Sequence, residues 1–153
     1  MCAARIAGAL DVVGNKSWRA HCYDGSIAMA REVLKLVDLR LDEFAAVRIA
    51  GDIDWSADPL ISAERLCHWE ATANLVFQGL PARVICQYDI ARCEPAFIHA
   101  ALRTHPIVFY KGRRVRSKYY EAPMILEQEP RLNGCSNDAN VVADMLSQLL
   151  PRA

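Results

Sequence analysis

No segment of the 153-residue sequence is apolar over the roughly 20 residues that a membrane-spanning helix needs. The N-terminus also lacks the long apolar core that follows the basic start of a secretory signal peptide. From these two absences we expect a soluble, cytoplasmic protein that has no membrane partner.

Neither sign of charge is in excess, because lysine plus arginine and aspartate plus glutamate number 18 each. A chain without net charge has no global field that attracts nucleic acid or anionic lipid. One local basic run lies on a predicted hairpin beside three tyrosines: Lys111, Arg113, Arg114, Arg116 and Lys118. Such a run can bind phosphates. Strand alternation favours a solvated face instead, so nucleic acid is not among the partners that we predict.

The six cysteines include no C-x-x-C pair, which is the spacing typical of structural zinc sites. Several of them lie in apolar stretches, where a reduced thiol behaves as a small hydrophobic side chain. We therefore predict free thiols in a reducing cytosol, with no metal ion and no cofactor.

The composition, 53% hydrophobic and 24% charged, is that of an ordinary globular protein, and the length suits one domain. We assign residues 1–130 to this domain and residues 131–153 to a helical tail. Residues 9–13 can form a short strand. Apolar residues then recur with helical spacing between residues 27 and 41, where Asp24 or Ser26 can cap the helix.

Strands and helices alternate through the centre of the chain. We expect strands at 46–50, 84–88 and 107–110, a helix capped by Ser62, a helix opened by Pro95, a hairpin return at 115–119 and a last helix at 137–150. The middle strands are almost continuously apolar, which indicates a mainly parallel sheet covered on both faces. The predicted fold is a three-layer α/β domain with a C-terminal β-hairpin and helix.

Three carboxylates are candidates for chemistry. Asp52 and Asp89 each follow a buried strand, and the ligand crevice of an open parallel sheet lies outside the carboxyl ends of its strands. Aspartate is equally common where a strand simply ends in a turn. Glu70 falls on or beside the apolar stripe of its helix, so its carboxylate must be paired, hydrogen-bonded or protonated. It either bonds to a structural partner or lines a pocket.

Signals for catalysis are few. His105 lies between a helix end and a strand, where the helix dipole alone can account for it. The segment Gly14-Asn15-Lys16-Ser17 lacks both the contiguous Gly-Lys-Ser and the upstream glycine of a phosphate-binding loop. No nucleophile with an adjacent base is readable, so the sequence does not predict an enzyme.

The order of short motifs resembles that of a known family, the MEDS domain, which is the sensory domain of methanogen and methylotroph regulators. The matching segments, spread over about residues 8–126, are Tyr23-Asp24-Gly25, Val47-Arg48-Ile49-Ala50-Gly51-Asp52-Ile53-Asp54-Trp55, Trp69-Glu70-Ala71 with Asn74, Val84-Ile85-Cys86-Gln87-Tyr88-Asp89, Ala101-Leu102-Arg103-Thr104-His105-Pro106 and Tyr119-Tyr120-Glu121-Ala122-Pro123. Single motifs are weak, but six in the family's order are fairly specific.

The resemblance implies an incomplete RecA-like core, related to the circadian-clock ATPases and used to sense small organic compounds or relay signals. It places Asp52 where true ATPases carry a magnesium-associated carboxylate. Two features depart from the family: members usually begin with a further strand-helix unit, and Ser117 replaces the usual asparagine. Without the first unit, either the fold rearranges, the chain forms a homodimer through an exposed sheet edge, or the sequence is a truncated product.

We therefore expect a non-catalytic sensory or regulatory domain in signal transduction or transcription regulation, which binds a small organic ligand or a regulatory protein partner. The candidate ligand-binding residues are Asp52, Trp55, Glu70, Tyr88, Asp89, His105 and Tyr120. The alternative function is that of a vestigial nucleotide-binding RecA-like domain, with weak or no ATPase activity.

Overall fold

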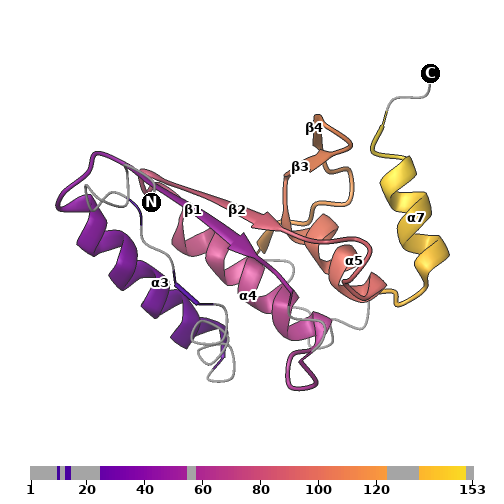
Figure 1. Cartoon of the computed structure of the whole chain (residues 1–153), viewed down its shortest axis with the longest axis horizontal. Helices are drawn as coiled ribbons and strands as arrows, with labels where there is room; N and C mark the ends of the chain where they lie inside the picture. Colours follow the sequence, from indigo (N-terminus) through magenta and orange to yellow (C-terminus); the bar gives the residue numbers. More distant parts are fainter. Residues whose placement is uncertain (1–9, 11–12, 15–24, 55–57, 124–134, 151–153) are drawn as a thin grey trace.

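Helices and strands alternate along the chain in the computed structural model, as Figure 1 shows. The structure describes residues 10, 13–14, 25–54, 58–123 and 135–150. In chain order, the elements are α3 (Ser26–Leu41), β1 (Val47–Asp52), α4 (Ala63–Val76), β2 (Ala82–Gln87), α5 (Pro95–Thr104), β3 (Ile107–Tyr110), β4 (Arg113–Arg116) and α7 (Ala139–Ser147). They form a mixed α/β domain with a small parallel sheet and a separate antiparallel hairpin.

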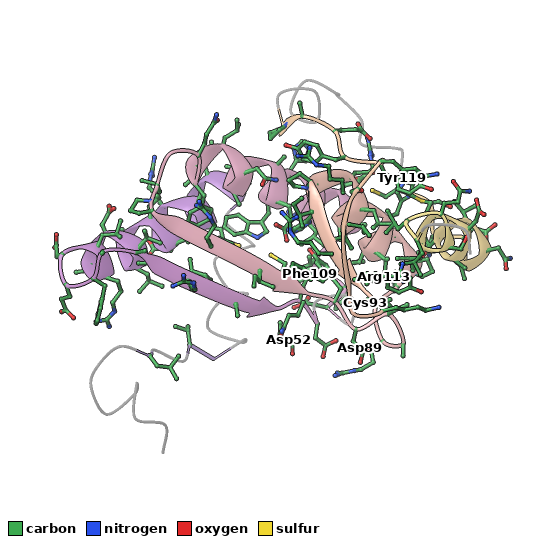
Figure 2. The ribbon with its side chains drawn as sticks, turned by 90° about the horizontal axis from the view of Figure 1, so that it is seen from above. Asp52, Asp89, Cys93, Phe109, Arg113 and Tyr119 are labelled. Carbon is green, nitrogen blue, oxygen red and sulfur yellow. The ribbon has the colours of Figure 1, made fainter. Side chains whose placement is uncertain are left out.

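Strands β1 and β2 are parallel neighbours, in a register that runs from Val47 opposite Ala82 to Asp52 opposite Gln87. Helix α4 connects them, and α3 packs beside α4, so both helices lie along the same face of the sheet (Figures 1 and 2). The other face carries exposed side chains, among them Ile85. In the described part of the chain, helices therefore cover one face; a third layer and the RecA-like relation remain predictions.

Helix α4 begins where the sequence predicts. The Ser62 side chain accepts the backbone N–H of Arg65 at 3.2 Å, and Glu64 lies in the first turn, where the helix dipole favours a carboxylate. Leu66 and Cys67 are fully buried on the face toward the other helices. The cap and the first-turn carboxylate set the residue at which the helix begins.

The start of α3 differs from the prediction. Gly25, with a φ of 97°, is the N-cap residue, and no side chain caps the helix there. Ser26 is already the first helical residue, so its predicted capping role is wrong; Asp24 and most of the predicted strand at 9–13 lie outside the described residues. Only glycine adopts such a positive φ without steric cost, which is why the chain turns into the helix at this position.

Helix α5 begins with Pro95 at its first positions, as predicted, and its inner face buries Phe97, Ile98 and Leu102. The chain then enters the β3–β4 hairpin, which turns through Lys111 and Gly112, both with positive φ. The hairpin pairs only with itself among the described strands.

The return strand runs from Arg113 to Arg116, so it begins two residues before and ends three residues before the predicted 115–119. Ser117 is buried, its hydroxyl donates to the Leu102 carbonyl at 2.7 Å, and its backbone N–H donates to the Pro106 carbonyl at 3.1 Å. The bond to Pro106 continues the ladder by one step, but Pro106 has no N–H to donate in return, and the bond to Leu102 holds Ser117 against the end of α5. The strand therefore ends at Arg116.

Helix α7 packs against α5 through Val142, Met145 and Leu146, and its N-cap Asp138 accepts the backbone N–H of Asn140 at 2.8 Å. It is shorter at both ends than the predicted 137–150, because Asp138 is the cap and the helix ends at Ser147. No helix among the described residues is long and apolar enough to cross a bilayer.

Candidate functional site

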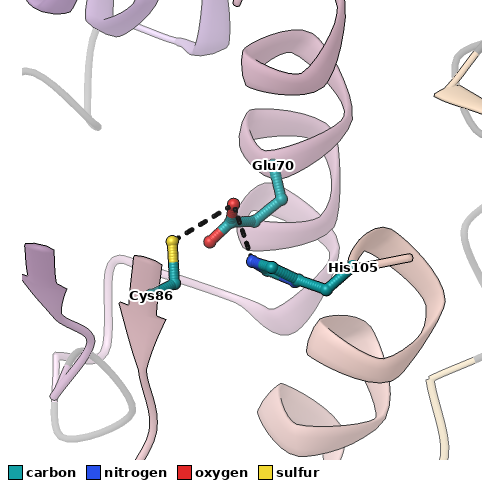
Figure 3. Close-up of side chains that lie close together, drawn as sticks. All are labelled: Glu70, Cys86 and His105. Atoms are coloured by element: carbon teal, nitrogen blue, oxygen red, sulfur yellow. Dashed lines mark hydrogen bonds and ion pairs between the residues drawn. The ribbon is translucent and has the colours of Figure 1, made fainter. Parts of the chain in front are cut away.

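A buried carboxylate lies at the centre of the candidate site. Glu70, on the inner face of α4, is only 4% exposed. Its Oε1 accepts a hydrogen bond from the Tyr88 hydroxyl at 2.7 Å, and its Oε2 lies 3.7 Å from the Cys86 thiol, which donates to it, and 3.6 Å from His105 Nε2. Figure 3 shows Glu70, Cys86 and His105 converging from α4, β2 and the end of α5.

The ring of His105 is oriented by the helix that precedes it. Its Nδ1 lies 2.9 Å from the Ala101 carbonyl and 3.0 Å from the Thr104 hydroxyl. A carbonyl oxygen can only accept, so we assign the proton to Nδ1. The ring therefore presents Nε2 to the carboxylate of Glu70, 3.6 Å from its Oε2.

The thiol and the phenol beside Glu70 are held in their protonated forms. Burial raises the pKa of the Cys86 thiol far above its usual value, and the negative charge of Glu70 raises it further. Burial, again with the charge of Glu70, raises the pKa of the Tyr88 phenol. Both groups are therefore hydrogen-bond donors to the carboxylate at neutral pH.

The Glu70 cluster opens into a groove of about 450 Å³ between α4, β2 and the segment that follows β4. Phe77, Val84 and Tyr120 contribute apolar surface to its walls, while Asn74 and Arg83 add polar groups. Asn74 Nδ2 donates to the Thr104 carbonyl at 2.7 Å, which ties the wall formed by α4 to the end of α5. A second, smaller cavity of about 220 Å³ lies between the first turns of α3 and α4 and contains none of the predicted site residues.

The structure therefore groups four of the predicted site residues. Glu70, His105 and Tyr120 line the groove, and Tyr88 bonds to Glu70. Asp52 is the last residue of β1 and Asp89 follows the end of β2 by two residues; both side chains are exposed (Figure 2). Neither lines the groove, and Trp55 lies outside the described residues.

The carboxylate of Asp89 has a structural role of its own. Its Oδ1 accepts the backbone N–H of Ala91 at 2.9 Å, and its carbonyl accepts the N–H groups of Arg92 and Cys93. These bonds form the turn that leads into α5, which is what aspartate at a strand end commonly does.

The basic run is exposed along the hairpin. Arg113, Arg114 and Arg116 on β4 all reach solvent. Lys111 lies over the Tyr110 ring at 5.3 Å, and Lys118 lies over the Tyr119 ring and donates to Gln148 on the last turn beyond α7. These two lysines therefore contact neighbouring aromatic rings of the protein itself.

Cys86 belongs to the site, although the sequence predicts only a small hydrophobic side chain within a strand at this position. Its spacing held the signal: Cys86 and Tyr88 are two residues apart, so an extended chain directs both side chains to one face. Cys67, Cys86, Cys93 and Cys135 are free thiols, as predicted, and Cys2 and Cys22 lie outside the described residues.

A second polar cluster lies behind the site, where Arg103 contacts both Glu121 and Cys135. A hydrogen bond from the Cys67 thiol, together with one from the Arg103 guanidinium at 3.9 Å, lowers the pKa of Cys135 from 9.0 to about 7. The pKa of Cys67 is raised in turn. The Cys135 thiolate is thus stabilised by folding.

This shift predicts a pH dependence of stability. A thiol whose pKa is lower in the folded state stabilises that state fully above its unfolded pKa, and the effect is lost as pH falls through 7. Cys67, with its raised pKa, loses its own contribution only above pH 9. Between pH 7 and 9 the free energy of unfolding should rise in the native chain and rise less in Cys135→Ser, measured by urea denaturation. Cys93→Ala should keep the full rise; equal slopes in all three proteins would contradict the assignment.

Comparison with known proteins gives one match. A family model described as "MEDS: MEthanogen/methylotroph, DcmR Sensory domain" matches residues 3–106, which is more than half of the chain. The matched range contains Glu70, Cys86, Tyr88 and His105, whereas Tyr120 lies beyond it. Neither the curated proteins nor the solved structures contain a significant match.

Proposed function

Because the chain belongs to the MEDS family of sensory domains, we propose that it binds a small organic ligand in the groove above Glu70 and passes the binding event on as a signal. The observation that supports this most strongly is a buried carboxylate that lines an open groove, accepts hydrogen bonds from Cys86 and Tyr88 and contacts His105 at the end of α5. Pockets for small molecules are typically apolar clefts of roughly 300–1,000 Å³ with a few convergent polar groups. The groove has this character.

The groove also offers a route by which binding could be transmitted. Glu70 belongs to the α4–β2 unit, whereas Tyr120 follows the separate β3–β4 hairpin, and both line the groove. The contacts of a ligand that touches both residues depend on how the α4–β2 unit and the hairpin are placed relative to each other. Such differential contact is what a ligand needs in order to shift a conformational equilibrium. The output would then be read by a regulatory protein partner in signal transduction.

The size of the ligand limits its affinity. The best very small ligands gain at most about 1.5 kcal/mol per non-hydrogen atom, so one of about five such atoms binds no tighter than roughly a few micromolar. We therefore propose a panel at millimolar concentration: short alcohols, halomethanes, aromatic acids, and ATP with magnesium. The readout is the melting temperature of the purified chain.

One class in the panel should raise the melting temperature. A ligand at about 100 times its dissociation constant stabilises the folded state by about 2.7 kcal/mol, which for a chain of this size corresponds to roughly 5–10 °C. Glu70→Gln should abolish the shift. Asp52→Asn, which alters an exposed carboxylate outside the groove, should leave the shift unchanged.

The controls separate loss of binding from loss of folding. Tyr120 is 36% exposed and lies outside the Glu70 hydrogen bonds, so Tyr120→Ala should weaken the shift while the protein without ligand melts normally. No shift with any compound, or a full shift that survives both Glu70→Gln and Tyr120→Ala, would overturn the ligand proposal. A shift with ATP that Asp52→Asn removes would instead establish the nucleotide-binding alternative.

A further inference from the structure

The three side chains around Glu70 Oε2 have the geometry of a metal-binding site. The carboxylate of Glu70, the sulfur of Cys86 and one ring nitrogen of His105 all lie within 4.8 Å of one another. Oε2 is already 3.7 Å from the sulfur and 3.6 Å from Nε2. In a tetrahedral zinc site with bonds of roughly 2.0–2.3 Å, ligand atoms lie about 3.3–3.8 Å apart. Small side-chain rotations would therefore bring all three ligands onto one ion.

The surrounding residues orient these ligands as the outer shell of a metal site does. Nδ1 of His105 donates to the Ala101 carbonyl, so Nε2 is the ring nitrogen that is directed into the cluster. The Tyr88 hydroxyl bonds to Oε1 of Glu70, which leaves Oε2 toward the cysteine and the histidine. Hydrogen bonds of this kind fix the tautomer and the direction of metal ligands.

Charge balance also favours an ion here. Among the described residues, Glu70 forms no ion pair with a lysine or arginine, and its contacts are Tyr88, Cys86 and His105. A divalent cation held by one carboxylate, one thiolate and one neutral imidazole gives a site of zero net charge. Burial of that neutral unit costs far less than burial of a lone carboxylate.

We propose that Glu70, Cys86 and His105 bind one Zn²⁺ ion, whose fourth coordination position faces the groove. The donor set of one oxygen, one sulfur and one nitrogen suits zinc and disfavours magnesium and calcium, which prefer oxygen alone. Three protein ligands with an open position are the arrangement of zinc sites that accept an exogenous ligand. The use of that open position by an organic ligand rests on the proposed function, whereas metal binding does not.

Binding of the ion exchanges a proton for the metal. The S–H bond of Cys86 breaks, the proton leaves to solvent, and the thiolate sulfur forms the bond to zinc. The hydrogen bond from Cys86 to Glu70 is replaced by coordination of both groups to the same ion. Zinc uptake should therefore release the thiol proton, and affinity should rise with pH.

The test uses the full chain, stripped with a chelator and titrated with Co²⁺ in place of zinc, with no organic ligand present. We expect one ion per chain, a near-ultraviolet thiolate-to-cobalt charge-transfer band, and displacement of that band by one equivalent of Zn²⁺. Cys86→Ala should lose the band, and Glu70→Gln and His105→Gln should each weaken Zn²⁺ binding at least about 100-fold. Tyr88→Phe, which alters only the outer hydrogen bond, should weaken it by about 10-fold.

Cys93→Ala is the matched control, because Cys93 is a buried thiol that bonds to the Ile53 carbonyl and is not one of the three proposed ligands. It should keep the band. Absence of stoichiometric binding in the native chain, or a band that survives Cys86→Ala, would overturn the zinc site. Neither result would contradict the ligand proposal, since the melting-temperature panel needs no metal. In the same way, a panel in which no compound shifts the melting temperature would not contradict zinc binding measured by the cobalt titration.

Discussion

Replacement of Glu121 by alanine is expected to lower the free energy of unfolding by about 3 kcal/mol. The Arg103 side chain is only 8% exposed, and its guanidinium donates to both carboxylate oxygens of Glu121, at 2.5 Å and 2.9 Å. Without the carboxylate, the guanidinium loses both of these hydrogen bonds and the charge of Glu121 while it remains largely desolvated. Removal of one partner of a buried pair is costly for this reason, even where the intact pair adds little.

An exposed ion pair in the same chain provides the control. Arg40 lies 3.6 Å from Glu43, whose side chain is 60% exposed. Exposed pairs contribute at most about 1 kcal/mol, so Glu43→Ala should change the urea midpoint little. If Glu121→Ala and Glu43→Ala lowered the free energy of unfolding by similar amounts, the burial of Arg103 would not be the cause of the destabilisation.

Replacement of Phe97 by alanine should have the other large effect, a loss of about 3–4 kcal/mol. Phe97 is 3% exposed on the inner face of α5, which packs against both α4 and α7. Loss of the ring removes its transfer free energy from water and leaves a cavity that helices on two sides cannot both fill. Against a typical stability of about 5–15 kcal/mol, the variant should unfold at a much lower urea concentration.

Phe109 allows the same substitution on the surface. It lies on β3 and is 68% exposed, in clear view on the hairpin in Figure 2. Phe109→Ala should alter the free energy of unfolding by no more than about 0.5 kcal/mol. A loss in Phe97→Ala no greater than that in Phe109→Ala would show that α5 is not part of the cooperative core.

Local signals predicted the elements well where side chains act on their own backbone. Ser62 bonds the first turn of α4, and Pro95 fits the first positions of α5, so both starts could be read from neighbouring residues. The cap at Gly25 and the end of β4 could not be predicted from neighbouring residues. The first depends on a backbone angle, and the second on a bond from Ser117 to a carbonyl 15 residues away.

The candidate site shows the same division. The position of Glu70 on an apolar stripe indicated that its carboxylate would need partners, and the structure shows those partners. Their identity was beyond the sequence, because Cys86 and His105 are 19 positions apart on different elements and meet only through tertiary packing. Asp52 and Asp89 were grouped with them from the general rule for open sheets, which gives the strand ends but not the position of the groove.

The way the elements pack also determines how the chain can be assembled. Helix α3 packs on α4, α4 on α5 and α5 on α7, while β1 pairs with β2 across the single helix between them. The α3–α4 and α4–α5 contacts join helices that follow one another in the chain, whereas α5 and α7 lie on either side of the β3–β4 hairpin. The hydrogen bond between Cys67 and Cys135 spans a longer stretch still, from α4 to the segment before α7. The entropy of loop closure grows with loop length, so assembly that begins with α4 and its neighbours closes the shortest loops first, and the contacts of α7 close the longest.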